Sequence, residues 1–375
     1  MTTNRPVDLS WDRGGEPGTR SQAPGVGSRA FSGGGGALAV AVDIGGTKIA
    51  AGLVDAAGRL TGERRTPTPA ADGGEAIMAA VLDCARPLLA LGGDRVVACG
   101  IATAGVVDAG GRISSATDLL TGWAGTDVRS VAGHALGLPV TVVNDCHAAG
   151  TAEARLGAAR GARTALVVAV GTGIGGALVT GGTTYPGPTG TAGALGHLPA
   201  PAAALVAGRR CSCGATDHIE AHASGPAIER TYHELTGHEL ASHELTGHEL
   251  TGHELTGHEL TGHELTGHEL TGDRLDLAAI AALARSGDPR AAQVISTAAT
   301  LLGRTLAGAA NLLDPDVIVI AGGVSRLGPL LLDPLRLAYR ADALPGPRRA
   351  PIHPATLTDQ AGLIGAGLTA LPPPS

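Results

Sequence analysis

Short apolar runs alternate with longer segments of helical periodicity along most of this chain. The apolar runs occupy residues 37–42, 96–101, 140–143, 164–170 and 317–321. Each run has the length and the Val, Ile, Leu and Ala content of a buried strand. Helical patterns occupy residues 75–91, 148–156, 275–285 and 291–313. Strands that alternate with helices in this way predict an α/β fold.

The length of the chain and the composition of its first residues predict how it is divided. Its 375 residues exceed what one hydrophobic core usually fills, so we expect two lobes. Residues 1–36 are rich in Gly, Pro, Ser and Arg and have no apolar periodicity, which predicts a disordered leader.

Charge and composition exclude several classes of protein. The net charge of -7, the pI near 6 and the scattered arginines argue against nucleic acid as a partner. We find no apolar stretch of about 20 residues and no apolar core in residues 1–20, so we expect neither a membrane span nor a signal peptide. The five cysteines include a close pair, Cys211 and Cys213, which suits a metal site in a reducing compartment. The chain is therefore predicted to be cytoplasmic.

A pentapeptide repeat interrupts the pattern. His-Glu-Leu-Thr-Gly recurs eight times over residues 233–272, with one variant copy that carries Ala241 and Ser242. Histidines five residues apart do not share a helix face, and a zinc-protease helix needs them four apart. We expect a tolerated insertion in a surface loop or helix end, since added loop length costs little entropy. A metal-buffering histidine tract and a β-solenoid are the alternatives.

Two glycine turns, far apart in the sequence, each follow a predicted strand. The first lies in residues 43–48 and the second in residues 171–176. Turns of this kind bring backbone N–H groups close to phosphate oxygens, and the Asp43 carboxylate can hold Mg²⁺ through water. A single such turn is equally typical of a simple hairpin, but two turns can bind one polyphosphate from both sides. The candidate phosphate-binding residues are Asp43, Gly45, Gly46, Thr47, Lys48, Gly171, Thr172, Gly173 and Gly175, together with Gly322 and Gly323 in a third glycine pair.

An aspartate lies between the two turns in sequence. Asn144 and Asp145 follow the apolar run 140–143 and precede a helical pattern. A carboxylate at such a strand end can accept the proton of a substrate hydroxyl as it attacks the γ-phosphate of ATP, while Asn144 orients a neighbouring hydroxyl. The alternative is that Asp145 merely caps the helix. This layout predicts a two-lobed phosphotransferase with Asp145 as its base.

A third group of residues is typical of a metal site. His197, Cys211, Cys213 and His218 supply four ligands of the kind that tetrahedral Zn²⁺ takes, and a filled shell would be structural. The alternative is a pair of reduced cysteines near two exposed histidines. Cys84, Cys99 and Cys146 are expected to be buried apolar residues, and oxidation of Cys146 beside the base is conceivable.

Taken together, these motifs resemble the ROK family of sugar kinases, within the hexokinase, actin and Hsp70 superfamily. The resemblance covers about residues 37–371 and is interrupted only by the repeat. It rests on the glycine turns, the Asn144-Asp145 pair and the metal ligands, and on Gly122-Trp123, Glu153, Gly196-His197, His218-Ile219-Glu220, Ala223-Ser224-Gly225 and Asn311 to Pro315.

The resemblance implies a two-lobed actin-like ATPase fold of the ribonuclease H-like kind, with a cleft between the lobes. We expect a smaller lobe over residues 37–160 and a larger lobe over residues 161–375, whose final helix returns to the first. It also implies ATP and Mg²⁺ as cofactors, a structural Zn²⁺, a sugar substrate and a homodimer. By the same resemblance Asn144, His197 and Glu220 would contact sugar hydroxyls.

Departures from the family pattern concern the sugar. Ala194 stands where the family usually has Glu before the Gly196-His197 pair, so one carboxylate that would bind sugar hydroxyls is missing. Asp118, a candidate sugar-binding residue, stands where Asn is expected, and the loop after it carries an extra residue. His218 replaces a third zinc cysteine but is itself a competent ligand.

These observations predict an ATP-dependent kinase for the 6-hydroxyl of a hexose, with glucose first and N-acylmannosamine second. A catalytically weak sugar-binding regulator is the competing class, for which Ala194 is the main argument. Sugar-responsive repressors of the same family carry an N-terminal helix-turn-helix, and the Gly- and Pro-rich leader cannot form one.

Overall fold

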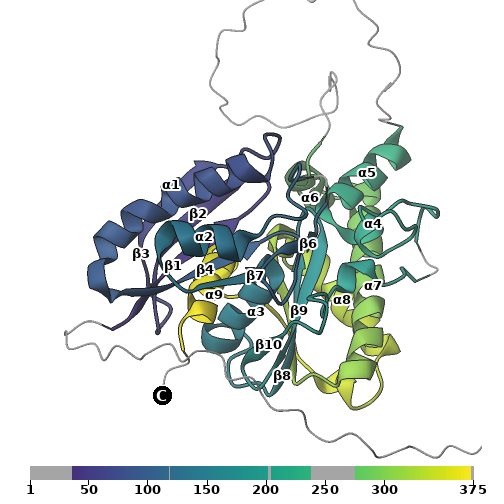
Figure 1. Cartoon of the computed structure of the whole chain (residues 1–375). Coiled ribbons are helices and arrows are strands. Elements are labelled where there is room, and N and C mark those ends of the chain that lie inside the picture. The colour runs from purple at the N-terminus through teal and green to yellow at the C-terminus, as the bar shows by residue number, and fades with distance from the viewer. Residues whose placement is uncertain (1–35, 118, 202–203, 238–274, 373–375) are drawn as a thin grey trace, which may run out of the picture. The chain divides into compact units, whose positions relative to one another are not determined.

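Two five-stranded sheets form the framework of the chain (Figure 1). The computed structural model describes residues 36–117, 119–201, 204–237 and 275–372, all of which belong to one unit that begins at Gly36. The predicted leader therefore lies almost wholly outside the described residues.

The first sheet has the strand order β3-β2-β1-β4-β7. Its strands are β1 (Leu38–Ile44), β2 (Lys48–Asp55), β3 (Leu60–Pro67), β4 (Val96–Thr103) and β7 (Val140–Asn144). Strands β3, β2 and β1 are antiparallel neighbours, whereas β1, β4 and β7 run parallel. Alternate residues of β1 enter two different cores, one shared with α1 (Gly74–Gly92) and α2 (Val128–Leu136) and the other with α3 (Asp145–Leu156) and α9 (Ala361–Ala370). Burial on both faces explains why β1 is a continuous apolar run.

The second sheet repeats this topology in the order β10-β9-β8-β11-β12. Its strands are β8 (Thr164–Val170), β9 (Ile174–Thr180), β10 (Thr183–Tyr185), β11 (Val317–Ala321) and β12 (Ile352–Pro354). Again an antiparallel trio is followed by two parallel strands. One face packs on α5 (Gly225–Thr236), α6 (Leu277–Arg285), α7 (Pro289–Leu313) and α8 (Pro329–Asp342). In each sheet the first hairpin therefore carries one of the two glycine turns.

Helices α3 and α9 connect the two sheets. Helix α9 packs on β1, β2 and β4 of the first sheet, while α3 contacts both α9 and β9 of the second sheet. The two helices approach closely, because a Cβ added at Gly365 would lie 1.8 Å from the Ala148 carbonyl oxygen. The buried carboxylate of Glu153 in α3 accepts hydrogen bonds from the amides of Thr356 and Leu357, which precede α9. The boundary that we expect between the two lobes, after residue 160, stays a prediction.

Helix α1 and the short turn η1 (Gly93–Arg95) that follows it form a segment that is long and apolar enough to cross a membrane, judged by length and composition alone. One face of the helix is accounted for within the fold, because Ile77, Val81, Ala85 and Leu88 are buried in the core of the first sheet, whereas Leu91 is exposed.

The strands expected at residues 96–101, 140–143, 164–170 and 317–321 are all confirmed. Helix α3 begins at Asp145, three residues before the predicted start, because Asn144 supplies the N-cap. Shorter elements that the apolar pattern did not predict complete the fold: β5 (Val106–Val107), β6 (Ile113–Ser115), α4 (Glu220–Ala223), η2 (Leu195–His197), η3 (Gly323–Leu327), η4 (Pro347–Arg349) and η5 (Thr358–Gln360).

The first copy of the pentapeptide repeat belongs to the fold. Residues 233–236 form the last turn of α5, and Gly237 ends the helix in the left-handed conformation. The buried His233 ring lies 3.0 Å from the Leu275 carbonyl oxygen, and Glu229 accepts a hydrogen bond from the Leu277 amide. The insertion is therefore shorter than predicted, and its remaining seven copies, residues 238–272, lie outside the described residues. The two chain segments that flank these copies are neighbours.

Deletion of residues 238–272 is expected to leave turnover and metal content unchanged. Because the flanking segments already meet, a short link replaces a long one, and the loss of loop entropy stabilises the protein by up to about 2 kcal/mol. Urea unfolding of the deletion variant against the full chain measures this. A variant that carries a Gly/Ser linker of the same length is the matched control and should unfold like the full chain. Lost turnover or lost metal in the deletion variant would contradict a passive insertion.

Candidate active site and metal centre

The first glycine turn joins β1 to β2. Asp43 is the penultimate residue of β1, and the Gly45 amide donates a hydrogen bond of 3.0 Å to the Lys48 carbonyl. The Thr68 hydroxyl, just past the end of β3, holds the turn by donating to the Gly45 carbonyl oxygen at 2.7 Å. A Cβ added at Gly46 would meet no atom within 4 Å. The backbone at Gly46 is therefore open to a ligand.

Asp145 lies at the junction of β7 and α3. The Asn144 side chain caps the helix by accepting hydrogen bonds from the amides of Cys146 and His147, and it donates to the Gly105 carbonyl at 3.0 Å. Helix α3 is therefore capped by Asn144, and a capping role is not needed to explain the presence of Asp145. One Asp145 carboxylate oxygen accepts from the Cys146 amide at 2.8 Å, which fixes the side chain.

Asp43 and Asp145 influence each other electrostatically. The pKa of Asp43 is raised from 3.8 to about 7, mainly by burial and also by the Asp145 charge, while Lys48 lowers it in part. Burial also raises the pKa of Asp145, although the Cys146 amide and the neighbouring His147 lower it in part. Two crowded carboxylates are a common arrangement at sites that bind a cation or move a proton.

The second glycine turn, between β8 and β9, lies against α3. A Cβ added at Gly175 would lie 2.4 Å from the Cys146 sulfur, so the residue after Asp145 is in contact with this turn. The third glycine pair is adjacent: Gly322 has φ +84°, and a Cβ added there would lie 2.3 Å from the Val170 carbonyl oxygen. The structure thus brings together the second glycine turn, the Asn144-Asp145 pair and the third glycine pair. The electrostatic interaction of Asp43 with Asp145 adds the first glycine turn to this group.

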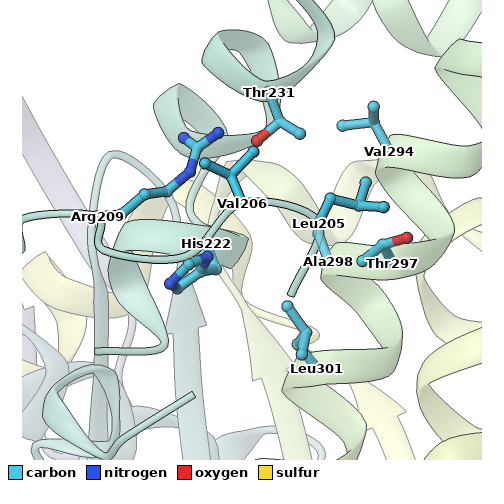
Figure 2. A pocket seen from close by; sticks show the side chains of 9 residues that line it. All are labelled: Leu205, Val206, Arg209, His222, Thr231, Val294, Thr297, Ala298 and Leu301. Atoms are coloured by element: carbon cyan, nitrogen blue, oxygen red, sulfur yellow. The ribbon is translucent and has the colours of Figure 1, made fainter. Parts of the chain in front are cut away.

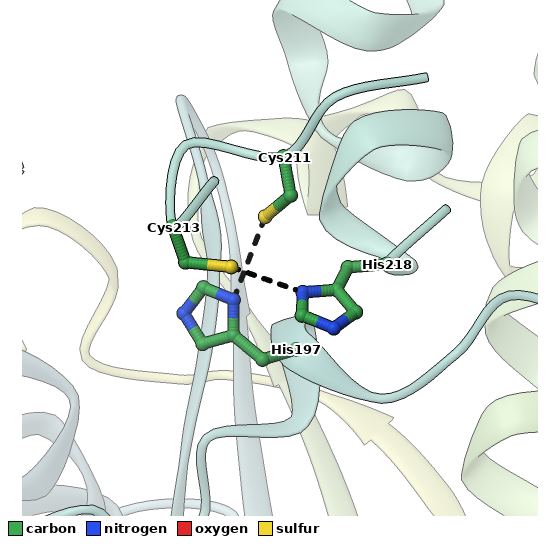
Figure 3. Close-up of side chains that lie close together, drawn as sticks. All are labelled: His197, Cys211, Cys213 and His218. Carbon is green, nitrogen blue, oxygen red and sulfur yellow. Dashed lines mark hydrogen bonds between the residues drawn. The ribbon is translucent and has the colours of Figure 1, made fainter. Parts of the chain in front are cut away.

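The four predicted metal ligands converge (Figure 3). Their ligand atoms all lie within 4.8 Å of one another, with 3.5 Å between Cys211 Sγ and His197 Nδ1 and 3.2 Å between Cys213 Sγ and His218 Nδ1. Tetrahedral Zn²⁺ with bonds of about 2.0–2.3 Å places its ligand atoms roughly 3.3–3.8 Å apart. The donor set and its spacing fit this metal.

Glu220 lies between the metal ligands and the second glycine turn. Its Oε2 accepts a hydrogen bond of 2.9 Å from the Ile174 amide, and its Oε1 accepts one of 2.6 Å from the Ser212 hydroxyl. Ser212 was not among the residues predicted from the sequence, because nothing in the Cys-Ser-Cys spacing indicates where its hydroxyl would lie.

Three further residues bear on the site. Gly362 of α9 lies against the Asp43 carboxylate, since a Cβ added there would be 2.7 Å from Asp43 Oδ2. This contact was also missed, because it joins opposite ends of the chain. The predicted sugar-binding residue Asp118 lies outside the described residues, and Ala194 is exposed at the start of η2.

A separate small cavity lies beside the loop that leads to Cys211 (Figure 2). Leu205, Val206 and residues of α7 line it, together with Arg209 and His222. Arg209 is buried and pairs with Glu234 of the first repeat copy, and the His222 ring lies 3.0 Å from the Asp217 carboxylate. None of the predicted catalytic or sugar-binding residues lines this cavity, so it is distinct from the candidate active site.

Two sheets of one topology, each opening on a glycine turn, define the two-lobed actin-like fold of a phosphotransferase. The model of the ROK family matches residues 39–371, and the chain belongs to this family.

The chain is similar to curated and solved members of the family. It is 32% identical to a glucokinase of Streptomyces coelicolor, over 88% of this chain and 96% of the relative. It is 31% identical to an N-acetylmannosamine kinase of Escherichia coli, over 88% and 97% of the two chains. A solved ROK family glucokinase from Streptomyces griseus, in complex with glucose and AMPPNP, is 31% identical with a TM-score of 0.68, over 89% of this chain and 99% of that one.

Proposed function

We propose that this chain is an ATP-dependent sugar kinase that phosphorylates the 6-hydroxyl of a hexose. The observation that carries the proposal is the setting of Asp145, which interacts with Asp43 beside the first glycine turn and, through Cys146, contacts the second. Burial raises the pKa of Asp145, and a carboxylate with a raised pKa is a better proton acceptor for an attacking hydroxyl.

The remaining residues position the reactants. Backbone amides of the two glycine turns, with Gly322 and Gly323, would bind the phosphates of ATP. Asp43 would hold Mg²⁺ through water, and bound Mg²⁺ neutralises charge on the phosphates. Asn144 keeps one amide hydrogen beyond its bond to Gly105, and Glu220 keeps lone pairs on both oxygens, so each can still bind a sugar hydroxyl. His197 would contact the sugar from the metal side.

Glucose is the proposed substrate, with an N-acylmannosamine as the alternative. The similarity to the Streptomyces coelicolor glucokinase and the Streptomyces griseus glucose complex supports the first, and the Escherichia coli relative supports the second. Ala194 offers no carboxylate to the sugar, which weakens the binding expected for glucose. We further propose a cytoplasmic homodimer.

The function is tested by coupled ADP release with Mg-ATP across glucose, mannose, fructose, N-acetylglucosamine and N-acetylmannosamine. Turnover on one sugar identifies the substrate. If folded, metal-loaded protein gives no turnover on any of them but melts at a higher temperature with one sugar, the chain is a sugar-binding regulator and the kinase proposal fails.

The metal centre is proposed to hold one structural Zn²⁺ through His197, Cys211, Cys213 and His218. Cys213→Ser is expected to lower zinc affinity at least about 100-fold, since loss of a ligand exceeds the usual effect of losing an outer hydrogen bond. Elemental analysis and competition with a chromophoric chelator measure this. Cys84→Ala, at a buried position of helix α1, is the matched control and should retain one Zn²⁺ per chain. Equal zinc content in wild type and Cys213→Ser would contradict the site.

A further inference from the structure

Ser212 connects the metal-binding loop to the candidate substrate site. Its hydroxyl donates a hydrogen bond of 2.6 Å to Glu220 Oε1, and the other carboxylate oxygen accepts from the Ile174 amide at 2.9 Å. Ile174 is part of the second glycine turn, and a Cβ added at the neighbouring Gly173 would lie 2.6 Å from Glu220 Oε2. The carboxylate is thus held between the metal loop on one side and the turn on the other.

The Ser212 bond gains importance when metal is bound. Cys211 Sγ lies 3.5 Å from Glu220 Oε1 and donates to it as a thiol. A cysteine that binds Zn²⁺ is a thiolate, which has no proton to donate and repels a nearby carboxylate. Among the described residues, Ser212 then supplies the remaining side-chain donor to Oε1 for which a hydrogen bond is found. A hydrogen bond from a hydroxyl to an ionised carboxylate is among the strong ones.

The backbone at Ser212 is fixed from both sides, because it lies between two metal ligands, Cys211 and Cys213. The Cys211 amide also donates to the Ala215 carbonyl, and the Gly214 amide to the Cys211 carbonyl, which closes the loop into a tight turn. A hydroxyl on such a loop has little freedom, so its bond to Glu220 transmits the position of the loop to the carboxylate.

We propose that Ser212 is a positioning residue that orients Glu220 for the sugar substrate and for the second glycine turn. The proposal rests on the proposed kinase function for its kinetic consequence, but its structural consequence, the order of the Ile174 amide, does not. Ser212 does not touch the reacting atoms and acts through Glu220 alone.

Ser212→Ala is expected to raise the KM for the sugar about 3- to 10-fold, while kcat and the KM for ATP change by less than about twofold. Zinc content, and the absorption spectrum of the Co²⁺-substituted protein, should match wild type because no ligand is altered. Ser212→Thr keeps a hydroxyl and should restore the sugar KM to within about twofold. Ser286→Ala, whose hydroxyl donates to the Leu283 carbonyl at the end of α6, is the matched control.

Hydrogen exchange of the Ile174 amide separates this proposal from the kinase proposal. In Ser212→Ala the amide should exchange at least about threefold faster than in wild type or Ser212→Thr, whether or not any sugar is turned over. An unchanged Ile174 exchange rate, loss of zinc in Ser212→Ala, or failure of Ser212→Thr to restore the sugar KM would each overturn the positioning role. Absence of turnover in wild type would overturn the kinase function and leave the exchange result to decide the role of Ser212.

Discussion

Asp145→Asn should lower kcat about 10³-fold on whichever sugar is turned over, with the KM for the sugar changed by less than about threefold. Removal of a general base usually costs 10²- to 10⁴-fold in rate. Asparagine has the same shape as aspartate, and its amide oxygen can still accept the hydrogen bond from the Cys146 amide. The helix cap is supplied by Asn144 and is untouched. The loss should therefore appear in the chemical step and not in folding or binding.

Single-turnover kinetics with Mg-ATP measure this effect without interference from product release. Asp83→Asn, on the exposed side of α1, is the matched control and should retain full activity. The metal content of Asp145→Asn should equal that of wild type. A loss in kcat of less than about tenfold, from protein that still binds the sugar, would mean that another group accepts the proton.

The residues of this site that could be predicted from the sequence are mainly those that come directly after a predicted strand. Asp43 and Asp145 were found because each lies at the carboxyl end of a continuous apolar run. The carboxyl ends of the parallel strands β1, β4 and β7 share one edge of the sheet, so the two aspartates were bound to come close. The metal ligands were found because Cys-x-Cys with flanking histidines has few other uses.

Residues that act through tertiary contacts could not be predicted. Gly362 reaches Asp43 because α9 packs back on the first sheet, and the family resemblance implies this return of the helix but not which of its residues meets Asp43. Helix α9 itself gives a weak signal, since it is apolar on most sides and rich in glycine, so that neither periodicity nor propensity indicates a helix. Ser212 was missed for a similar reason, because the position of a hydroxyl between two metal ligands depends on how the loop folds.

The repeat illustrates a limit of a different kind. Identical copies look alike in sequence, yet the first copy has a place in the fold that its sequence does not distinguish. Glu234 of that copy pairs with buried Arg209, and His233 is buried against the chain at Leu275. Its position in the last turn of helix α5, and not its composition, gives the first copy these contacts.

In the ligand-free protein, the contribution of Asp43 to stability should fall as the pH rises from about 4 to 7, so Asp43→Asn should become increasingly more stable than wild type over this range. The pKa of Asp43 is raised from 3.8 to about 7 by burial and by Asp145, so over this window the folded state holds a proton that the unfolded state has released. Stability then falls with increasing pH, because the folded state binds more protons. Below about pH 4 both states are protonated and the effect vanishes, while above pH 7 the full penalty applies.

The penalty at pH 8 is about 2–4 kcal/mol, since each unit of pKa shift corresponds to about 1.4 kcal/mol. Urea unfolding of metal-loaded protein without Mg²⁺ or nucleotide, at pH 5, 6, 7 and 8, should show Asp43→Asn to be more stable than wild type throughout, with the difference growing from roughly a third of its full value at pH 5 to its full value at pH 8. Asp83→Asn should follow the wild-type curve. Mg-ATP should flatten the wild-type curve, because a cation near Asp43 favours its ionised form. Parallel curves for wild type and Asp43→Asn would mean that the folded protein ionises Asp43 at no cost in stability, and that neither burial nor the Asp145 charge raises its pKa.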